Sequence, residues 1–198
     1  MHGMINRAIQ CFVRDTYGAH KWHEVAEAAD LGFENFEAML SYPDKMTLDV
    51  LSASARALRK PVETFMEDLG TYLVSHPNVE PIRRLLRFGG EDFTEFLFSL
   101  NELEGRARLA LADLEVPNLS LGATGEGTFA LTVSNSIPGF GYAMLGVMRA
   151  MADDYGALVF LEHQGWTDSG DEVVTIHLLE AAFAQGRSFD LAAGALLS

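Results

Sequence analysis

The feature of this sequence that most constrains its fold is a change of hydrophobic periodicity near residue 108. Before that point, apolar residues recur at intervals of three and four, which is the spacing of one face of an α-helix. After it, short segments alternate apolar and polar residues, as half-buried strands do. Helices grouped before strands predict an α+β domain, in which the two kinds of element are segregated and the sheet is antiparallel.

The first part of the chain is predicted to form a succession of helices. We expect them at residues 3–17, 22–29, 34–40, 47–59, 61–76, 79–88 and 91–108. The last of these is the element around which the rest is organised, because it carries one continuous apolar stripe. The stripe consists of Phe93, Phe96, Leu97, Leu100, Leu103 and Ala107. Asp92 or Thr94 can cap its first turn.

The second part is predicted to form a four-stranded antiparallel sheet with one long helix. We expect strands at 119–123, 129–133, 158–166 and 172–179, and the helix at 140–155. We therefore expect a single domain over residues 1–181. It would consist of a helical subdomain, 1–108, and an α/β subdomain, 109–181. The tail, residues 182–198, is small and apolar, and it either docks as a short helix or stays loose.

Composition excludes several classes of function. The chain has 198 residues, of which 48% are hydrophobic, so it can bury a core. Its formal net charge of −14 would repel phosphate backbones and anionic membranes, so we expect neither nucleic acid nor membrane as a partner. Cys11 is the only cysteine, which excludes an internal disulfide. No apolar run is long enough to span a bilayer and no signal peptide is evident, so we expect a soluble cytoplasmic protein.

The acidic residue Glu104 is unusual, because it falls on the apolar side of the helix predicted at 91–108. Burying an unpaired charge is costly, and two interpretations follow. In one, the last turn frays and Glu104 reaches solvent or pairs with Arg108. In the other, the position faces a pocket.

Enzymatic motifs are missing from the sequence. It has no glycine-rich phosphate loop, no paired-histidine zinc motif and no nucleophile elbow, so we predict that the protein is not an enzyme. His20 and His23 lie three residues apart, but two histidines without a third ligand are weak grounds for a metal site. Met144, Met148 and Met151 form an apolar helical stripe, which fits either a core or an adaptable pocket.

Several segments, in order along the chain, carry a family resemblance. They are MHGMINRAIQCFVRDTYG at 1–18, Tyr42-Pro43, LLRFGGEDFTEFLFSLNEL at 85–103, and the run from Pro117 to about Leu179. Together they resemble the haem-nitric oxide/oxygen binding (H-NOX) family, the sensory domain of soluble guanylate cyclases and their bacterial relatives. The resemblance implies the order of helices and strands predicted above.

The same resemblance shows what this chain lacks. In the family, the central helix ends in Leu-His, and the histidine ligates haem iron; here the pair reads Leu103-Glu104. The family holds the haem propionates with a Tyr-x-Ser-x-Arg motif, whose three positions here are Val133, Asn135 and Ile137. The loss of arginine matters, because its planar fork binds carboxylates bidentately and isoleucine cannot.

The apolar wall of the family's pocket is retained. Pro117 matches the proline that packs under the haem ring, and Ile5 and Ile9 match positions on the distal side. The expected pocket is therefore lined by Ile5, Ile9, Leu97, Leu100, Glu104, Pro117, Val133, Asn135, Ile137, Met144 and Met148.

Three hypotheses follow from this combination. The first, which we favour, is a haem-free sensory domain, with no cofactor, whose apolar cavity binds a small apolar ligand or which acts through a partner protein. The alternative is a haem-binding sensor of nitric oxide or another gas with non-standard axial ligation, for example by His76 or His163. The third is an enzyme on this scaffold, for which no set of catalytic residues can be assembled. No output segment follows in the sequence, so we expect the partner to be a separate kinase or cyclase, or a second copy in a homodimer.

Overall fold

The computed structural model describes residues 3–110, 116–134 and 137–189. Its helices are α1 (Gly3–Tyr17), α2 (Ala19–Ala28), α3 (Asp44–Leu58), α4 (Val62–Ser75), η1 (Pro77–Val79), α5 (Glu80–Arg87), α6 (Phe93–Ser99), η2 (Leu100–Glu102), α7 (Leu103–Ala110) and α8 (Phe140–Tyr155). Its strands are β1 (Asn118–Gly125), β2 (Thr128–Ser134), β3 (Leu158–Trp166) and β4 (Glu172–Glu180).

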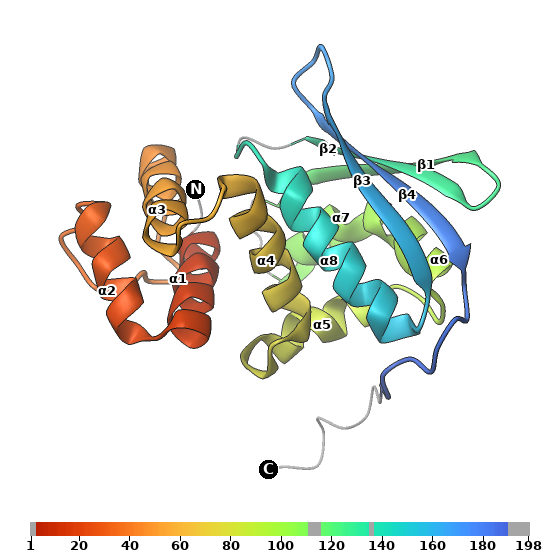
Figure 1. Ribbon diagram of the computed structural model, residues 1–198, viewed down its shortest axis with the longest axis horizontal. Coiled ribbons are helices and arrows are strands. Elements are labelled where there is room, and N and C mark those ends of the chain that lie inside the picture. Colours follow the sequence, from red (N-terminus) through yellow and green to blue (C-terminus); the bar gives the residue numbers. More distant parts are fainter. Residues whose placement is uncertain (1–2, 111–115, 135–136, 190–198) are drawn as a thin grey trace.

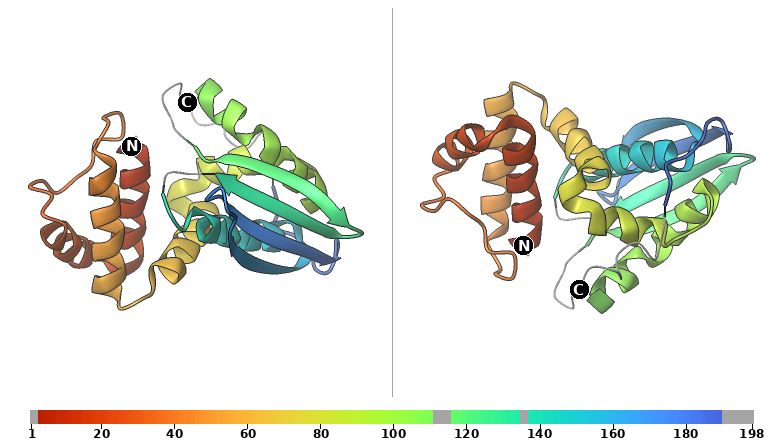
Figure 2. Two further views of the ribbon diagram at one scale, coloured as in Figure 1. Left: turned by 90° about the horizontal axis from the view of Figure 1, so that it is seen from above. Right: turned by 90° about the horizontal axis from the view of Figure 1, so that it is seen from below.

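These elements form two lobes joined by α4. Helices α1, α2 and α3 gather at one end of the molecule and form the helical lobe. Helix α4 leads from them to the sheet lobe, which consists of the sheet, α8 and the remaining helices (Figure 1). The two views in Figure 2 show the same separation from above and below. The four strands form one antiparallel sheet in the order β1-β2-β4-β3. The predicted α+β class, the four strands and the helix 140–155 are therefore confirmed.

The interior consists of two apolar clusters that touch. One lies among α1–α4 and contains Ile9, Phe12, Phe36 and Phe65 among others. The other joins α6, α8 and the inner face of the sheet, with Phe96, Leu97, Leu100, Leu131, Met148 and Ile176 fully buried. Phe140 and Tyr142, in the first turn of α8, pack against both clusters. The start of α8 therefore lies where the two lobes meet.

Helices α4 and α8 approach each other at backbone distance. A Cβ atom added to Gly70 of α4 would collide with the carbonyl group of Ala143, and one added to Gly146 of α8 would collide with the carbonyl of Glu67. Only glycine has no Cβ, so these two positions set the close packing of the pair. The contact makes α4 and α8 the structural connection between the lobes.

The predicted helix at 34–40 is wrong, because this segment is an irregular loop. Side chains from the first two helices satisfy its backbone instead of helical hydrogen bonds. Gln10 accepts a hydrogen bond from the N–H of Phe36 at 2.9 Å, and Trp22 donates one to the carbonyl of Glu34 at 2.6 Å. Phe36 itself is buried and anchors the loop.

The helix predicted at 91–108 is broken by one turn of 3-10 helix at Leu100–Glu102. Its predicted N-cap is confirmed, since Asp92 accepts a hydrogen bond from the N–H of Glu95 at 2.9 Å. At the break, Asn101 bonds both backbone groups of Leu121 on the edge strand β1: its Oδ1 accepts from the N–H at 2.7 Å and its Nδ2 donates to the carbonyl at 3.4 Å. The tighter turn thus ties this helical segment to the sheet.

Two further expectations concern membranes and the tail. Within the described ranges, no helix is long and apolar enough to cross a membrane. Residues 183–189 dock without forming a helix, and the N–H groups of Phe183, Ala184 and Arg187 donate to carbonyls at the C-terminal end of α8. The rest of the predicted tail, 190–198, lies outside the described residues.

Candidate functional site

The residues predicted to line the pocket come from both lobes. Ile9 and Ile137 are buried in the cluster of α1–α4, against which Ile5 also packs. The sheet cluster contains Leu97, Leu100, Val133, Met144 and Met148. Pro117 is buried just before β1, and Asn135 lies outside the described residues. The structure thus places the apolar part of the predicted lining on two contacting cores.

Glu104 lies on the surface of α7. Its side chain is 30% exposed, and its Oε1 lies 2.6 Å from Nη2 of Arg108, one helical turn further on. Leu103, not Glu104, packs against the core. The expected ion pair with Arg108 is therefore present, whereas the expected fraying of the helix is not, since α7 continues to Ala110.

Positions 133 and 137 offer no polar group to an anionic ligand. Val133 and Ile137 are buried, the first in the sheet cluster and the second in the helical cluster. A haem propionate at these positions would meet hydrocarbon, and a haem iron at position 104 would meet a carboxylate that is already paired. These side chains fit a haem group poorly.

A buried acid–histidine pair lies at the start of α8. The side chains of His163 and Glu172 are only 4% and 5% exposed, and Nε2 of His163 lies 2.8 Å from Oε2 of Glu172. Nδ1 of His163 accepts a hydrogen bond from the N–H of Gly165 at 3.0 Å, so the proton of a neutral imidazole is on Nε2 and is donated to Glu172. The other carboxylate oxygen, Oε1, accepts from the N–H of Gly139 at 2.9 Å.

Local backbone geometry and aromatic packing hold this pair in place. The register between β3 and β4 shifts between His163 and Gly165, and this irregularity directs the Gly165 N–H back to the imidazole ring. Tyr142 stacks on that ring with centroids 4.0 Å apart and planes 6° apart, and Trp166 meets its edge at 5.4 Å. Burial raises the pKa of Tyr142, and the negative charges of Glu63 and Glu172 add to the effect.

Glu172 is not among the predicted site residues, although the sequence carries a signal for it. Glu172 shares the phase of Val174 and Ile176, which form the buried face of β4. A charged residue in the buried phase of a strand indicates a partnered interior carboxylate. His163 was considered only as a substitute iron ligand, and its position beside Glu172 depends on strand pairing.

Neither proposed substitute ligand is free of protein contacts. Both ring nitrogens of His163 are hydrogen-bonded, as described above. Nδ1 of His76 accepts from the N–H of Asn78 at 3.3 Å, and its ring packs on Tyr72 at 4.8 Å. Across the part of the chain that the structure describes, no group of three histidine, cysteine or acidic side chains is placed to hold a metal ion.

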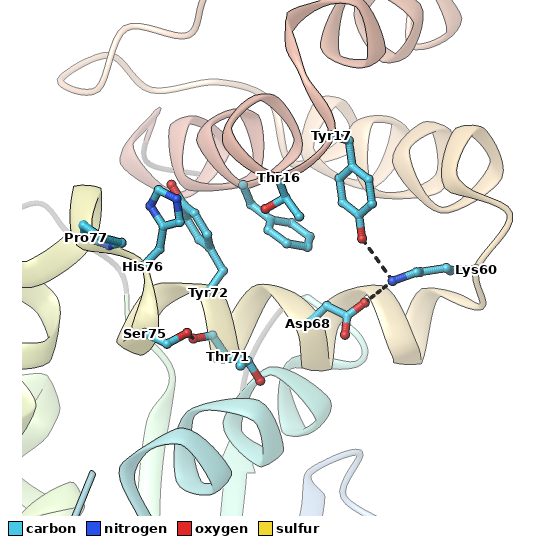
Figure 3. A pocket seen from close by; sticks show the side chains of 10 residues that line it. Thr16, Tyr17, Lys60, Asp68, Thr71, Tyr72, Ser75, His76 and Pro77 are labelled. Carbon is cyan, nitrogen blue, oxygen red and sulfur yellow. Dashed lines mark hydrogen bonds and ion pairs between the residues drawn. The ribbon is translucent and has the colours of Figure 1, made fainter. Parts of the chain in front are cut away.

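A separate pocket of about 340 Å³ opens between α1 and α4 (Figure 3). Its lining consists of Phe12, Thr16, Tyr17, Lys60, Asp68, Thr71, Tyr72, Ser75, His76 and Pro77. At one end, Nζ of Lys60 donates to Asp68 at 2.5 Å and to the Tyr17 hydroxyl at 3.0 Å, and these bonds raise the pKa of Lys60. This polar rim belongs to the outer surface of the helical lobe and shares no residue with the predicted pocket.

A partly exposed polar contact involving Tyr72 of that pocket's lining also joins α1 to α4. The hydroxyl of Tyr72 donates to Asp15 at 2.8 Å, and Nδ2 of Asn78 donates to the same oxygen at 2.9 Å. Burial acts to raise the pKa of Asp15, but the hydrogen bonds from Asn78, Tyr72 and Arg14 outweigh it, so this pKa is lowered. Burial raises the pKa of Tyr72, and its hydrogen bond to Asp15 raises it further. These bonds fix the end of α1 against the end of α4.

Comparison with known proteins gives a family model and distant relatives. Residues 2–163 match the model described as Haem-NO-binding. Soluble guanylate cyclases 89Db and 89Da of Drosophila melanogaster are 21% and 22% identical to this chain over 158 residues, which is 80% of this chain. The chain spans only 24% of the length of each of these curated relatives.

Solved structures show the same fold at low identity. An H-NOX protein from S. oneidensis, a triple mutant in the Fe(II) ligation state, has a TM-score of 0.77 and 16% identity. The match covers 96% of this chain and 100% of that one. The Fe(II) unliganded H-NOX protein from K. algicida also has a TM-score of 0.77, with 15% identity, and covers 93% of this chain and 100% of its own.

Proposed function

The chain belongs to the haem-NO-binding (H-NOX) family, and from that premise we propose that it is a sensory domain of the family that works without haem. In this proposal, a small apolar ligand occupies the region between the helical lobe and the sheet lobe. Residues 1–181 act as one unit in it, and no step of catalysis takes place in the domain.

The observation that carries the proposal is that a glutamate, Glu104, stands where the family has the histidine that ligates haem iron. A carboxylate is a poor axial partner for ferrous iron, and it would stand beside the negative propionates. Glu104 is moreover engaged by Arg108 at 2.6 Å on the surface of α7. Val133 and Ile137 supply no charge-assisted hydrogen bond where the family uses tyrosine and arginine.

The proposed lining favours an apolar ligand. It consists of Ile5, Ile9, Leu97, Leu100, Glu104, Pro117, Val133, Asn135, Ile137, Met144 and Met148. Hydrophobic walls with few polar groups are typical of sites that bind uncharged organic molecules. Met144 and Met148 are buried on α8, and the unbranched methionine side chain adapts its shape to a guest.

The connection between α4 and α8 supports a route for the signal. Met144 and Met148 lie on the helix that packs at backbone distance on α4, so a ligand that displaces them also presses on the joint between the lobes. We include in the proposal a partner of kinase or cyclase type, since the curated relatives are guanylate cyclases. A homodimer is the second arrangement included.

Binding of an uncharged fluorescent probe tests the proposal. Nile red should bind the purified protein saturably, and small apolar compounds should compete with it. The variant Met144→Phe, which adds bulk to a buried wall, should weaken binding several-fold. The variant Met39→Phe serves as a matched control, because Met39 is 71% exposed. Equal probe affinity in the two variants, or no saturable binding, would refute an apolar cavity on α8.

A further inference from the structure

The pocket between α1 and α4 has no part in the proposed function, and its walls suit a ligand of their own. We propose that it binds a small uncharged aromatic molecule with a hydrogen-bond acceptor at each end, of the kind found in aryl ketones and ethers. An aromatic floor lies between two groups of unused donors, one at Lys60 and one at His76, which Figure 3 shows at opposite ends of the pocket. This site goes beyond the proposed function and does not depend on it.

The floor of the pocket is aromatic and buried. The ring centroids of Phe12 and Tyr72 lie 5.4 Å apart, and these residues are only 3% and 5% exposed. Tyr17 meets the Phe12 ring edge-on, with centroids 5.8 Å apart. The volume of about 340 Å³ is at the lower end of the range for small-molecule sites. Since aromatic rings pack favourably on one another, we expect the middle of the ligand to be a single aromatic ring.

One end of the pocket has donors that no protein acceptor uses. An ammonium group has three N–H donors, and Nζ of Lys60 uses two of them, for Asp68 at 2.5 Å and for the Tyr17 hydroxyl at 3.0 Å. Because that hydroxyl accepts from Lys60, its own proton is available to another acceptor. Within the described ranges neither group makes a further hydrogen bond, so a ligand oxygen at this end meets two donors.

The other end offers a single donor whose position is fixed. Nδ1 of His76 accepts a hydrogen bond from the N–H of Asn78 at 3.3 Å, so a neutral imidazole carries its proton on Nε2. Among the residues that the structure describes, none accepts from this Nε2–H group. The ring packs on Tyr72 at 4.8 Å, and the Tyr72 hydroxyl is bonded to Asp15 at 2.8 Å. The donor is therefore held in place before a ligand arrives, which lowers the entropic cost of binding.

The charges around the pocket favour an uncharged ligand. The ammonium group of Lys60 is already paired with Asp68, and Asp15 places a second carboxylate beside Tyr72. A ligand carboxylate would be repelled by both aspartates and by a chain whose formal net charge is −14. A ligand ammonium would have to displace Lys60 from Asp68. Carbonyl and ether oxygens accept hydrogen bonds without either penalty.

Thr71 connects this pocket to α8. Its side chain lines the pocket, and its hydroxyl lies within hydrogen-bond distance of the carbonyls of Glu67, at 3.1 Å, and Gly146, at 3.5 Å. The preceding residue, Gly70, packs at backbone distance on Ala143. A ligand that contacts Thr71 should therefore change the surroundings of Gly146, although α8 does not line the pocket.

An NMR titration with a defined probe tests the site. The probe is para-methoxyacetophenone, which has one aromatic ring with a carbonyl oxygen at one end and an ether oxygen at the other. It should shift the amide resonances of Tyr72 and Gly146 saturably, with a Kd on the order of a millimolar for a molecule of this size. Two matched compounds should each bind at least several-fold more weakly: para-cymene, which has a similar shape and no acceptor, and para-methoxybenzoate, which is anionic. Equal or tighter binding of either compound, or no saturable shift with the probe, would overturn the proposal.

Variants of the lining show where the probe binds. His76→Phe keeps a ring against Tyr72 and removes the Nε2 donor, so the Kd should rise by about 2- to 10-fold. Thr16→Phe adds bulk at an exposed position of the lining and should weaken binding further. The matched controls His23→Phe and Thr167→Phe change exposed residues outside the pocket and should leave the Kd unchanged. The same Kd in the variants and in their controls would refute the site.

These outcomes are separable from those of the apolar cavity. Met144→Phe should weaken Nile red binding and leave the Kd of the probe unchanged, because Met144 does not line the pocket. Thr16→Phe should do the reverse. If instead Met144→Phe weakens probe binding and Thr16→Phe does not, the probe occupies the cavity on α8 and the pocket proposal is overturned. Absence of Nile red binding, with the expected pattern for the probe, would remove the proposed function and leave this site standing.

Discussion

Restoring the haem-binding residues should convert this domain into a haem protein. The change is the fourfold variant Glu104→His, Val133→Tyr, Asn135→Ser and Ile137→Arg, which returns the axial ligand and the three propionate contacts. The single variant Glu104→His supplies an axial ligand only, at a position on α7 that is 30% exposed. We expect weak hemin binding from the single variant and stoichiometric binding from the fourfold one.

The expected gain follows from the hydrogen bonds that are added. A hydrogen bond to a charged group contributes about 1.5–3 kcal/mol, so three of them strengthen binding by at least about 4.5 kcal/mol. Each 1.4 kcal/mol is a tenfold change, so the hemin Kd should fall by roughly a thousandfold relative to the single variant. Without hemin the variant should be less stable, because Val133 and Ile137 are buried. An arginine left there without an anion costs about 3 kcal/mol or more.

Absorbance titration and thermal melting together show whether the fourfold variant binds hemin. Hemin is added to the wild type, the single and fourfold variants, and Glu102→His, which places a histidine at an exposed neighbouring position. The fourfold variant should develop a saturable Soret band, and hemin should raise its Tm. A folded fourfold variant that takes up no hemin would refute the reasoning, because it would mean that the space between the lobes is closed to a guest.

Three further predictions concern stability. Asp154→Asn should destabilise the fold by about 3 kcal/mol, because Asp154 is fully buried and accepts two hydrogen bonds from Arg83, at 2.7 and 3.0 Å; urea unfolding measures this. Asn101→Ala should cost about 1–2 kcal/mol in the same assay and speed amide exchange at Leu121, whose N–H it leaves without its partner. Asp15 has a lowered pKa, so its contribution to stability is present above the unfolded pKa of about 3.8 and is lost as pH falls through the lower folded value; Asp15→Asn should remove this acid-dependent part of a Tm-against-pH curve.

Neighbouring exposed residues provide the controls for these variants. Asp153→Asn and Asn118→Ala change the same residue types at exposed positions and should each alter stability by less than about 0.5 kcal/mol. Equal losses in Asp154→Asn and Asp153→Asn would contradict the role of the arginine contact. Unchanged exchange at the β1 edge in Asn101→Ala would contradict the link between the helix break and the sheet.

Local periodicity was sufficient to predict much of the fold. The stripe at 91–108 and the alternation in the strands are set by neighbours along the chain, and those elements are present, apart from the turn of 3-10 helix. The helix prediction for residues 34–40 was wrong although the apolar spacing there fits a helix. The side chains of Gln10 and Trp22, which are distant in sequence, form hydrogen bonds with the backbone of this segment instead. Hydrogen bonds from side chains that are distant in sequence, which here replace those of a helix, cannot be predicted from a window of ten residues.

The candidate site was predicted only in part, for a related reason. Glu104 pairs with Arg108 along one helix, and this four-residue spacing is visible in the sequence. Glu172 and His163 are nine residues apart, and Gly139 is 33 residues from Glu172; they meet only because β3 pairs with β4 and α8 begins beside them. The alternation of residues in the last strand could have indicated that Glu172 is buried. Its hydrogen-bond donors could not be predicted, because tertiary structure brings them to it.

The absorbance spectrum of the purified protein tests the central claim, a haem-free H-NOX domain, most directly. The protein is produced in cells supplied with a haem precursor, purified, and measured before and after incubation with equimolar hemin. We predict no Soret band after purification and no stoichiometric band after incubation, because Glu104 is paired with Arg108, and because Val133 and Ile137 place hydrocarbon where the family has tyrosine and arginine. A sharp, saturable Soret band that shifts on addition of nitric oxide would contradict it.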